Sequence, residues 1–346
     1  MPFAHRNNNK LERAFQREDC EVSATHSRRD LFRLAGGGVA LAALGTSLPG
    51  IAQASAPMLG VMRPSIYRFK LGSFEITNFL DGVGFPPGPH PVFGNNQPAD
   101  VVQKYAADYG LPTTKWENSY TATMVNTGKE LMLFDTGNGK GRMATAGNLP
   151  ALLGTAGYTP DQVDVVVITH GHPDHIGGLM EDGKPAYPNA RYVFGEVEFD
   201  YWRRGENIPE ARKANREQFM KVATPFAEKA TFLKNEGEVV SGVRAIPVFG
   251  HSPGMMGFHV ESDGQRLLIW ADTANHYIFS IQQPDWHMGF DQDKEAGAAT
   301  RRRVLDMVSK DRLATIGFHM PFPGVGFVER TATSYRWVPA SYQFNL

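Results

Sequence analysis

Cysteine is nearly absent from this chain. The only one among its 346 residues is Cys20, which lies in an N-terminal stretch that we expect to be removed on export. The mature chain would then carry no thiol, which excludes both a disulfide framework and a cysteine-ligated metal site. A metal bound by the mature chain would have to be held by nitrogen and oxygen ligands.

The chain also lacks a large net charge of either sign. The 35 Lys and Arg residues nearly balance the 36 Asp and Glu residues, which gives a formal net charge of −1. No basic run lies outside the N-terminal stretch, so we expect no nucleic-acid partner. No internal repeat is visible, and the length favours one large α/β domain over two.

The longest apolar run near the N-terminus is too short for a membrane anchor. It covers residues 34–48 and contains four glycines, whereas a spanning helix needs about 20 apolar residues. The adjacent arginines Arg28 and Arg29 precede it in the pattern Ser-Arg-Arg-Asp-Leu-Phe-Arg, and a small-x-small sequence ends at Ala54. These features predict a twin-arginine export signal that is cleaved after Ala54.

We therefore divide the chain into three parts: a signal over residues 1–54, a linker over residues 55–64 and a folded domain over residues 65–346. The expected location is periplasmic or secreted. The export machinery of the twin-arginine pathway, which carries folded proteins, is the partner expected during transport.

One short segment of the folded domain is rich in metal-type ligands. Four of them lie within six residues: His170, His172, Asp174 and His175. They follow the β-branched run of residues 165–168, which predicts a buried parallel strand, and the carboxyl ends of such strands carry the sites of α/β sheets. Pro173 suits the first position of a helix, so a loop and a helical turn would direct the first two ligands and the last two to neighbouring points. This arrangement suggests a two-metal site.

Other expected strands end in similar residues. His251, Asp272 and His319 each follow an apolar run and stand in a turn, and Asp135 does so in Asp135-Thr136-Gly137. Strands are expected within residues 65–81, 120–135, 165–168, 191–194, 243–248, 258–270, 314–318 and 327–337. Helices are expected within residues 149–157, 196–233 and 294–308, and a Gly- and Pro-rich loop over residues 82–98 is expected to cover the site. This pattern fits an α/β sandwich of two mixed sheets with helices outside.

The order of these motifs resembles the metallo-β-lactamase superfamily. The matching elements are Asp135-Thr136-Gly137, His170-x-His172-x-Asp174-His175, His251, Asp272 and His319. The resemblance implies a four-layer αβ/βα sandwich. Residues 69–178 are further similar to the branch of methyl parathion hydrolase and its lactonase relatives, for example in Val125-Asn126-Thr127-Gly128.

Carried over to this chain, the resemblance implies one metal held by His170, His172 and His251, and a second held by Asp174, His175 and His319. Asp272 would bridge the two ions. A bridging hydroxide would be the nucleophile, and Asp174 and Asp272 are the candidate catalytic carboxylates. Zinc suits these ligands best, with manganese, cobalt and iron as alternatives. Asp135 would accept a hydrogen bond from a ligand histidine, or else cap its own turn.

Several residues stand apart from this assignment. His276 either lines the substrate pocket or is a loop residue, whereas His90, His259 and His287 match no motif and are interpreted as structural. Met255 occupies a position where many relatives carry a second histidine, and Ala271 replaces a glycine common before the bridging aspartate. Both changes are expected to alter local structure and to leave the metals in place.

The ligand types narrow the predicted reaction. His172 stands where the flavodiiron branch has glutamate, and Asp272 stands where true metallo-β-lactamases carry Cys or Ser. No basic cluster favours RNA or a glutathione thioester. We therefore expect a hydrolase that acts on a small, neutral, apolar ester or lactone, with phosphotriesters such as methyl parathion as further candidates. The alternatives are a hydrolase of another substrate class and a non-catalytic periplasmic protein that binds metal or a partner. The resemblance also raises a homodimer as a candidate assembly.

Overall fold

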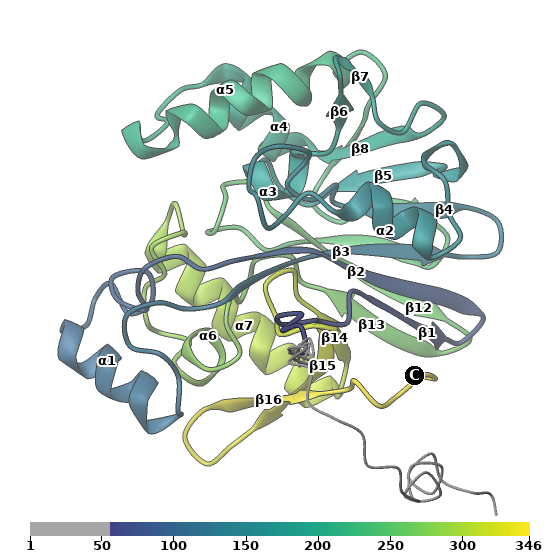
Figure 1. The fold of residues 1–346 in the computed structure, drawn as a ribbon. Coiled ribbons are helices and arrows are strands. Elements are labelled where there is room, and N and C mark those ends of the chain that lie inside the picture. Colours follow the sequence, from purple (N-terminus) through teal and green to yellow (C-terminus); the bar gives the residue numbers. More distant parts are fainter. Residues whose placement is uncertain (1–55) are drawn as a thin grey trace, which may run out of the picture. The chain divides into compact units, whose positions relative to one another are not determined.

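Two seven-stranded sheets face each other in the computed structural model (Figure 1). The first has the order β1 (Ile66–Leu71), β2 (Phe74–Gly84), β3 (Asn118–Asn126), β4 (Leu131–Phe134), β5 (Val165–Ile168), β8 (Arg191–Gly195) and β9 (Thr231–Leu233). The second has the order β10 (Glu238–Val240), β11 (Val243–Pro247), β12 (Met256–Ser262), β13 (Gln265–Ile269), β14 (Ala314–Ile316), β15 (Val325–Arg330) and β16 (Tyr335–Pro339). A short hairpin, β6 (Met180–Glu181) and β7 (Lys184–Pro185), stands apart from both sheets.

The structure describes residues 56–346. The expected export signal, its cleavage site and Cys20 lie outside the described residues. No helix among those that the structure describes is long and apolar enough to cross a membrane.

Strand alternation explains why the sheets are buried on both faces. In β5, Val165 and Val167 join the core between the two sheets, whereas Val166 and Ile168 face the helices on the outer side. In the second sheet, Leu267 of β13 points into the same central core and its neighbour Leu268 points outward. Because successive side chains of a strand point to opposite faces, a strand covered on both sides needs an unbroken apolar run.

Helices cover the outer faces of both sheets, as expected for the αβ/βα sandwich. Figure 1 shows α2 (Leu149–Thr155), α4 (Glu196–Arg204) and α5 (Lys213–Val222) beyond the first sheet, and α7 (Lys294–Asp311) beside the second. The remaining short helices are α3 (Pro173–Ile176) and α6 (Phe279–Gln282). Both sheets are mixed: β4, β5, β8 and β9 are parallel neighbours, and so are β13 and β14. The predicted fold class is confirmed.

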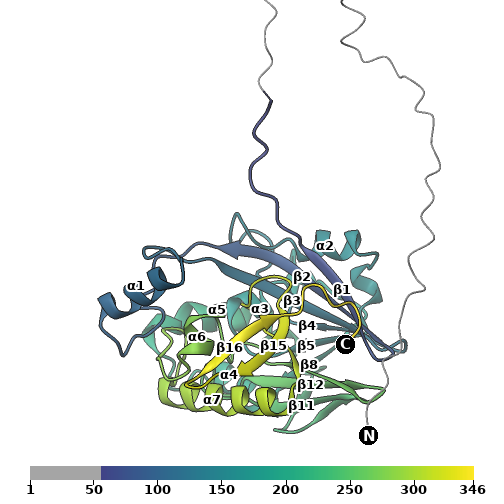
Figure 2. The same ribbon diagram turned by 90° about the horizontal axis from the view of Figure 1, so that it is seen from below.

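Some local expectations were wrong. Residues 196–233 are not helical throughout, because Thr231–Leu233 pairs with β8 as an edge strand. Helix α1 (Ala99–Asp108) was not expected and lies at the far end of β2 and β3, close to α6 (Figure 2). The loop that follows β2 does not line the cavity at the ligand cluster. Instead its Phe93 is fully buried against Trp116 and Phe279, at centroid distances of 4.8 and 4.9 Å, since burial of this ring stabilises the loop more than exposure over the site would.

Candidate metal centre

The ligand-type side chains follow the carboxyl ends of four strands. His170 comes after β5 of the first sheet, while His251, Asp272 and His319 come after β11, β13 and β14 of the second. Strand β11 runs in the same direction as the parallel pair β13 and β14, because two antiparallel pairings separate it from β13. All three therefore deliver their ligands to one edge of the second sheet, opposite the end of β5.

Backbone hydrogen bonds between the turns fix this arrangement. The N–H of Trp270 donates to the carbonyl of Ile316 at 3.0 Å, which aligns the Asp272 and His319 turns. The N–H of Met256 donates to the carbonyl of Thr169 at 3.0 Å and connects the two sheets beside His170. The site is thus assembled from both sheets and cannot be complete in either alone.

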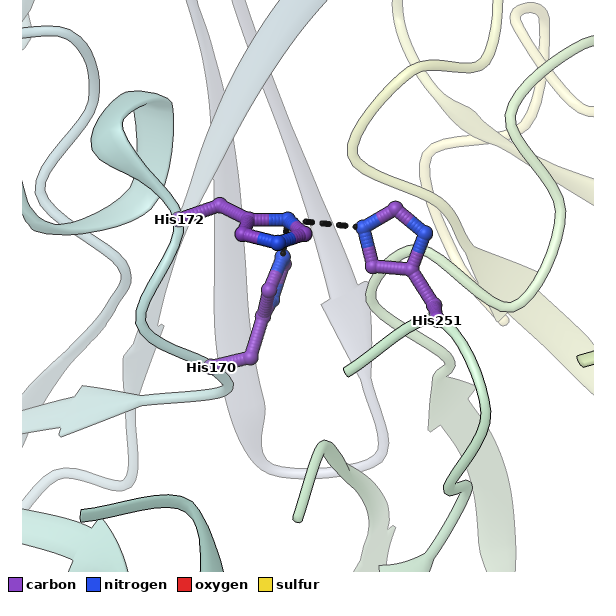
Figure 3. A group of neighbouring side chains, drawn as sticks. All are labelled: His170, His172 and His251. Carbon is purple, nitrogen blue, oxygen red and sulfur yellow. Dashed lines mark hydrogen bonds between the residues drawn. The ribbon is translucent and has the colours of Figure 1, made fainter. Parts of the chain in front are cut away.

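Three imidazoles form the first group of ligand atoms (Figure 3). His172 Nδ1 lies 2.9 Å from His170 Nε2 and 2.9 Å from His251 Nε2. All three rings are buried, and the figure shows them converging from two different loops. Three nitrogens pointing at one position are a typical set for a tetrahedral divalent cation with one open position.

A second group lies beside the first. His175 Nε2 and His319 Nε2 lie 3.7 and 3.5 Å from the same carboxylate oxygen, Asp174 Oδ2. His175 is fully buried and Asp174 is partly exposed. Pro173 opens helix α3, as predicted, so that Asp174 and His175 stand in its first turn.

Asp272 lies between the two groups. Its Oδ2 is 3.2 Å from His251 Nε2 of the first group and 2.9 Å from His319 Nε2 of the second. Its Oδ1 is 3.4 Å from His175 Nε2. One carboxylate thus contacts both groups, which is the position a bridging ligand requires.

Two of the ligand atoms have no hydrogen-bond partner in the described part of the chain. His175 Nε2 and Asp272 Oδ1 are buried and make no hydrogen bond to any residue that the structure describes. Buried polar atoms are almost always satisfied, so such orphans need an explanation. The two atoms face one another within the cluster, and divalent cations bound by nitrogen and carboxylate ligands would satisfy both.

The pKa values of the cluster histidines are shifted in opposite directions in its two halves. Burial, followed by the repulsion of neighbouring imidazoles, holds the pKa of His170 and of His172 well below the ordinary value. Burial acts the same way on His175, but the carboxylates of Asp272, Asp135 and Asp174 together outweigh it and raise the pKa of His175 well above 6.5. The carboxylate-rich half therefore requires positive charge, which protons supply in the metal-free protein.

Asp135 lies directly behind the ligands. Its Oδ2 accepts from His175 Nδ1 at 2.7 Å and from Thr169 Oγ1 at 2.9 Å, and its Oδ1 accepts from the Thr169 N–H at 2.8 Å. Asp135 has a φ of 60°, a left-handed conformation that aspartate tolerates better than most residues. This contact holds the Nδ1 proton of His175 and leaves Nε2 free to face the cluster.

The other ligand histidines are fixed in the same way by residues that the sequence did not reveal. His251 Nδ1 donates to Asp291 Oδ1 at 3.1 Å, and Asp291 Oδ2 accepts from the fully buried Arg301 at 2.6 Å. His172 Nε2 lies 3.3 Å from Gln292 Oε1, and His319 Nδ1 donates to the carbonyl of Ser119 at 2.8 Å. Asp291 and Gln292 stand in an irregular segment without periodicity. The sequence carries no signal for them, because the burial of Arg301 that demands an acidic partner is known only from the folded chain.

Glu198 connects two ligand loops. Its Oε1 accepts from the N–H of Gly171 at 2.8 Å and from Ser252 Oγ at 2.6 Å, and its Oε2 accepts from the N–H of Gly254 at 2.9 Å. Trp202 Nε1 also donates to Oε1, at 2.6 Å. One buried carboxylate thus sets the spacing between the His170–His172 loop and the His251 loop.

The two departures from the family pattern have visible structural consequences. Met255 is fully buried among the residues that pack under α7, so an apolar side chain fills the position without contacting the ligand cluster. Ala271 has a φ of 52°. This left-handed conformation explains why glycine is common there, and an alanine adopts it only with strain.

A small cavity opens onto the cluster. It has a volume of about 170 Å³ and is lined by His172, Asp174, His251, Asp272 and His319 together with Asn118, Tyr120, Arg142, Pro173, Arg212, Asn215 and Phe290. Burial lowers the pKa of Arg212, and the nearby carboxylates of Asp174 and Asp291 oppose that shift. The two guanidinium groups make the cavity more polar than the neutral, apolar pocket that we expected from the sequence.

A larger chamber of about 750 Å³ adjoins it at His319. Its walls are mainly apolar and aromatic: Leu111, Pro112, Trp116, Glu117, Ser119, His276, Tyr277, Ile278, Phe279, Gln282, His319, Pro321, Phe322, Pro323, Arg336, Trp337, Pro339 and Ser341. His276, whose role the sequence left open, is buried and lines this chamber. Trp116 also lines the chamber, whereas Phe93 belongs to the core behind it and Phe85 is half exposed.

A sandwich of two mixed sheets with a histidine- and aspartate-rich cluster at its strand ends defines a class of metal-site proteins. The sequence model of the metallo-beta-lactamase superfamily matches residues 117–309, which is more than half of the chain. This chain belongs to the metallo-β-lactamase superfamily.

Individual relatives are more distant. The N-acyl homoserine lactonase of Bacillus thuringiensis is 22% identical over 171 residues, which are 49% of this chain and 61% of the lactonase. The match thus spans about three fifths of the length of this curated relative.

Two solved structures share the fold over most of the chain. AidC, described as a dizinc quorum-quenching lactonase, superposes with a TM-score of 0.74 at 23% identity and covers 80% of this chain and 97% of its own. The hydrolase AbOPH superposes with a TM-score of 0.74 at 25% identity and covers 81% of this chain and 98% of its own.

Proposed function

We propose that this protein is a metal-dependent hydrolase that cleaves lactones or carboxylic esters with two divalent metal ions at the His/Asp cluster. Zinc suits these ligand types best. The observation that carries the proposal is the convergence of ligand atoms from four strand ends, with Asp272 in contact with both groups. The lactonase and hydrolase relatives support the same reaction type.

The donors divide into two sets. His170, His172 and His251 would hold one ion, and Asp174, His175 and His319 would hold the other. Asp272 would be shared. When bound, the ions lower the pKa of a water molecule and polarise the oxygen under attack.

The protein's own residues do the positioning. Asp135, Asp291 and Ser119 keep the outer nitrogens of the ligand imidazoles occupied, so that the inner nitrogens face the cavity. Asp174, partly exposed at the cavity, is placed to orient the attacking water through its carboxylate. Arg142 and Arg212 line the same cavity and suit the polar end of a substrate and the carboxylate that hydrolysis generates.

The chamber suits the apolar part of the substrate. Its volume of about 750 Å³ falls in the usual range for small-molecule sites, and it meets the metal cavity at His319. A substrate with its polar reacting group in the small cavity and an apolar chain or ring in the chamber would fill both. Phosphotriesters with an aromatic leaving group fit the same division and are the second candidate class.

A substrate panel tests this proposal. N-acyl homoserine lactones, aryl esters, methyl paraoxon and nitrocefin would be assayed with the wild-type protein, with His172→Ala and with the matched control His259→Asn, which changes a histidine of β12 outside both cavities. We expect turnover of lactones or aryl esters and about two metal ions per chain. Turnover should be lost in His172→Ala and retained in the control His259→Asn. The proposal fails if no compound reacts faster with the wild-type protein than with His172→Ala, and such a result would favour a non-catalytic metal- or partner-binding role.

We further propose export by the twin-arginine pathway on the N-terminal sequence alone. Replacing Arg28 and Arg29 by lysine should retain the protein in the cytoplasm, and cell fractionation measures this. Retention of normal export would contradict the proposal. A homodimer is proposed from the family resemblance, and sedimentation velocity distinguishes it from a monomer.

A further inference from the structure

His276 is held in a single ring orientation in the chamber wall. Its Nδ1 accepts two backbone N–H groups, from Ile278 at 3.1 Å and from Phe279 at 3.3 Å. An atom that accepts two hydrogen bonds carries no proton, so the proton of the neutral ring lies on Nε2. Burial lowers the pKa of His276 to about 3, and the ring is therefore neutral throughout the physiological range.

Aromatic neighbours prevent the ring from turning away. Tyr277 stacks on it at a centroid distance of 4.8 Å, and Phe279 lies at 4.6 Å. Phe93 and Trp116 contact it edge-on at 5.3 and 6.3 Å. A ring packed on several sides presents its free N–H in one fixed direction.

One donor in the chamber wall has no hydrogen-bond partner among the residues that the structure describes. Within the part of the chain that the structure describes, His276 Nε2 makes no hydrogen bond, although its ring lines the chamber. Buried donors normally have acceptors, and a ligand is one source of them.

The position of the chamber indicates which ligand that is. His319 lines both the chamber and the cavity at the ligand cluster, and Ser119, whose carbonyl fixes His319, lines the chamber. A molecule reacting at the cluster therefore extends past His319 toward His276. The ligand of the chamber is part of the substrate.

We propose that His276 Nε2–H selects substrates whose apolar part carries a second oxygen acceptor, such as a ketone, amide or ester carbonyl, away from the bond that is cleaved. This inference rests on the proposed hydrolase function. The substrate class is esters or lactones that carry a further carbonyl in an otherwise apolar part of the molecule. A site that hydrogen-bonds such a group discriminates strongly against the analogue that lacks it, because the buried donor is then unpaired.

Two substitutions of His276 separate its two nitrogens. Asparagine places its amide oxygen near the position of Nδ1, so His276→Asn keeps the acceptor for the Ile278 and Phe279 N–H groups and removes the chamber donor. Glutamine places its amide nitrogen near Nε2, so His276→Gln keeps the chamber donor and weakens the turn. His259→Asn changes a histidine of β12 that lines neither cavity and is the matched control.

The experiment compares kcat/KM for phenyl octanoate with kcat/KM for a series of phenyl oxo-octanoates whose ketone moves from carbon 4 to carbon 7. The wild-type protein should prefer at least one ketone position by tenfold or more. His276→Asn should reduce that preference to less than threefold, whereas His276→Gln should keep most of it and His259→Asn should leave it unchanged. A wild-type protein without any preferred position, or a preference unchanged in His276→Asn, would overturn the inference.

A binding measurement keeps the inference separate from the reaction. Acetophenone and ethylbenzene differ mainly in one carbonyl, and their binding to the full-length protein can be followed by NMR of ¹⁵N-labelled histidine. Acetophenone should bind at least fivefold more tightly to wild type than to His276→Asn and should shift the Nε2 resonance, whereas ethylbenzene should not distinguish them. If no ester is hydrolysed but acetophenone behaves in this way, the proposed function fails and the donor site stands. If esters are hydrolysed and acetophenone does not distinguish the variants, His276 serves only to hold its turn.

Discussion

The two cavities that meet at His319 are built in different ways. Around the ligand cluster, each ligand histidine has a polar partner for its outer nitrogen, such as Asp135 for His175, Asp291 for His251 and Thr169 for His170. The chamber is lined mainly by Pro, aromatic and aliphatic side chains from four separate segments. Hydrogen-bonded networks allow few substitutions, whereas apolar packing tolerates many that conserve volume. The reaction is therefore fixed more tightly than the substrate.

The largest effect is expected from the carboxylate shared by both ligand groups. Asp272→Asn should lower kcat/KM by about 10³-fold, which corresponds to roughly 4 kcal/mol of transition-state stabilisation. An amide is a weak bridging ligand and its NH₂ would face the imidazole of His319. Metal analysis should show fewer than two ions per chain. Retention of two ions with full activity would exclude Asp272 as the bridge.

Substitution of Asp135, the partner behind His175, should reduce activity less than loss of a metal ligand and more than a change in the chamber. Asp135→Asn puts an NH₂ group opposite donors from Thr169 and His175. Loss of such outer partners typically costs about 10- to 100-fold in metal affinity or activity. Competition with a chromogenic chelator measures the affinity. An affinity equal to that of wild type would mean that Asp135 only caps its turn.

Filling the chamber should affect binding of large substrates alone. Leu111 lines the chamber and is partly exposed, so Leu111→Trp can be accommodated while reducing its volume. We expect KM for long acyl esters to rise by about tenfold with kcat for phenyl acetate nearly unchanged, because only uniform binding is lost. Steady-state kinetics on a series of acyl lengths decides. An equal rise in KM for phenyl acetate would show that the chamber and the cavity at the ligand cluster are not independent.

The metal-free protein should be most stable near pH 6.5. The pKa of His170 and His172 lies below that value in the folded protein, so their contribution to stability is lost as pH falls below 6.5. The pKa of His175 and His319 lies above it, so their contribution is lost as pH rises above 6.5. After chelation, the Tm measured as a function of pH should pass through a maximum near pH 6.5, a few degrees above its values on either side. Added zinc should remove the decline on the alkaline side, and an unchanged alkaline decline would argue against displacement of these protons by metal.

The smallest effect is expected at Ala271. Its left-handed backbone is strained for alanine, but glycine also gains freedom in the unfolded chain, so the two terms partly cancel. Ala271→Gly should stabilise the protein by about 0.5–1 kcal/mol, or roughly 1–2 °C in Tm for a domain of this size. Differential scanning calorimetry measures it. Destabilisation would mean that the neighbouring Asp272 turn already accommodates the alanine methyl.

How far the sequence predicted the molecule depends on the kind of contact. His170 and its neighbours were visible because β5 is a short, unbroken apolar run with ligand residues directly at its end. The fold class followed from the same alternation of strands and helices. Asp291 and Arg301 were not visible, because their partners are set by tertiary contacts: Asp291 meets His251 across 40 residues and Arg301 meets Thr273 across 28.

The chamber was the least predictable part. Its walls come from residues 111–119, 276–282, 319–323 and 336–341, and no local pattern connects these segments. His276 illustrates the limit: sequence reasoning could only offer a pocket residue or a loop residue. Its role depends on two backbone N–H groups and four aromatic rings that only the folded chain brings together.

Glu198 has a consequence for the order in which the centre can be made. It joins Gly171 of the first sheet to Ser252 and Gly254 of the second, and His319 arrives only when β14 has paired beside β13. A nascent chain that has emerged from the ribosome as far as Asp272 has six of the seven candidate ligands and no complete second group. In the proposed two-metal site, a full complement of metal requires that β14 has paired beside β13. The metal content of a preparation would then report the fraction of molecules in which this strand has folded.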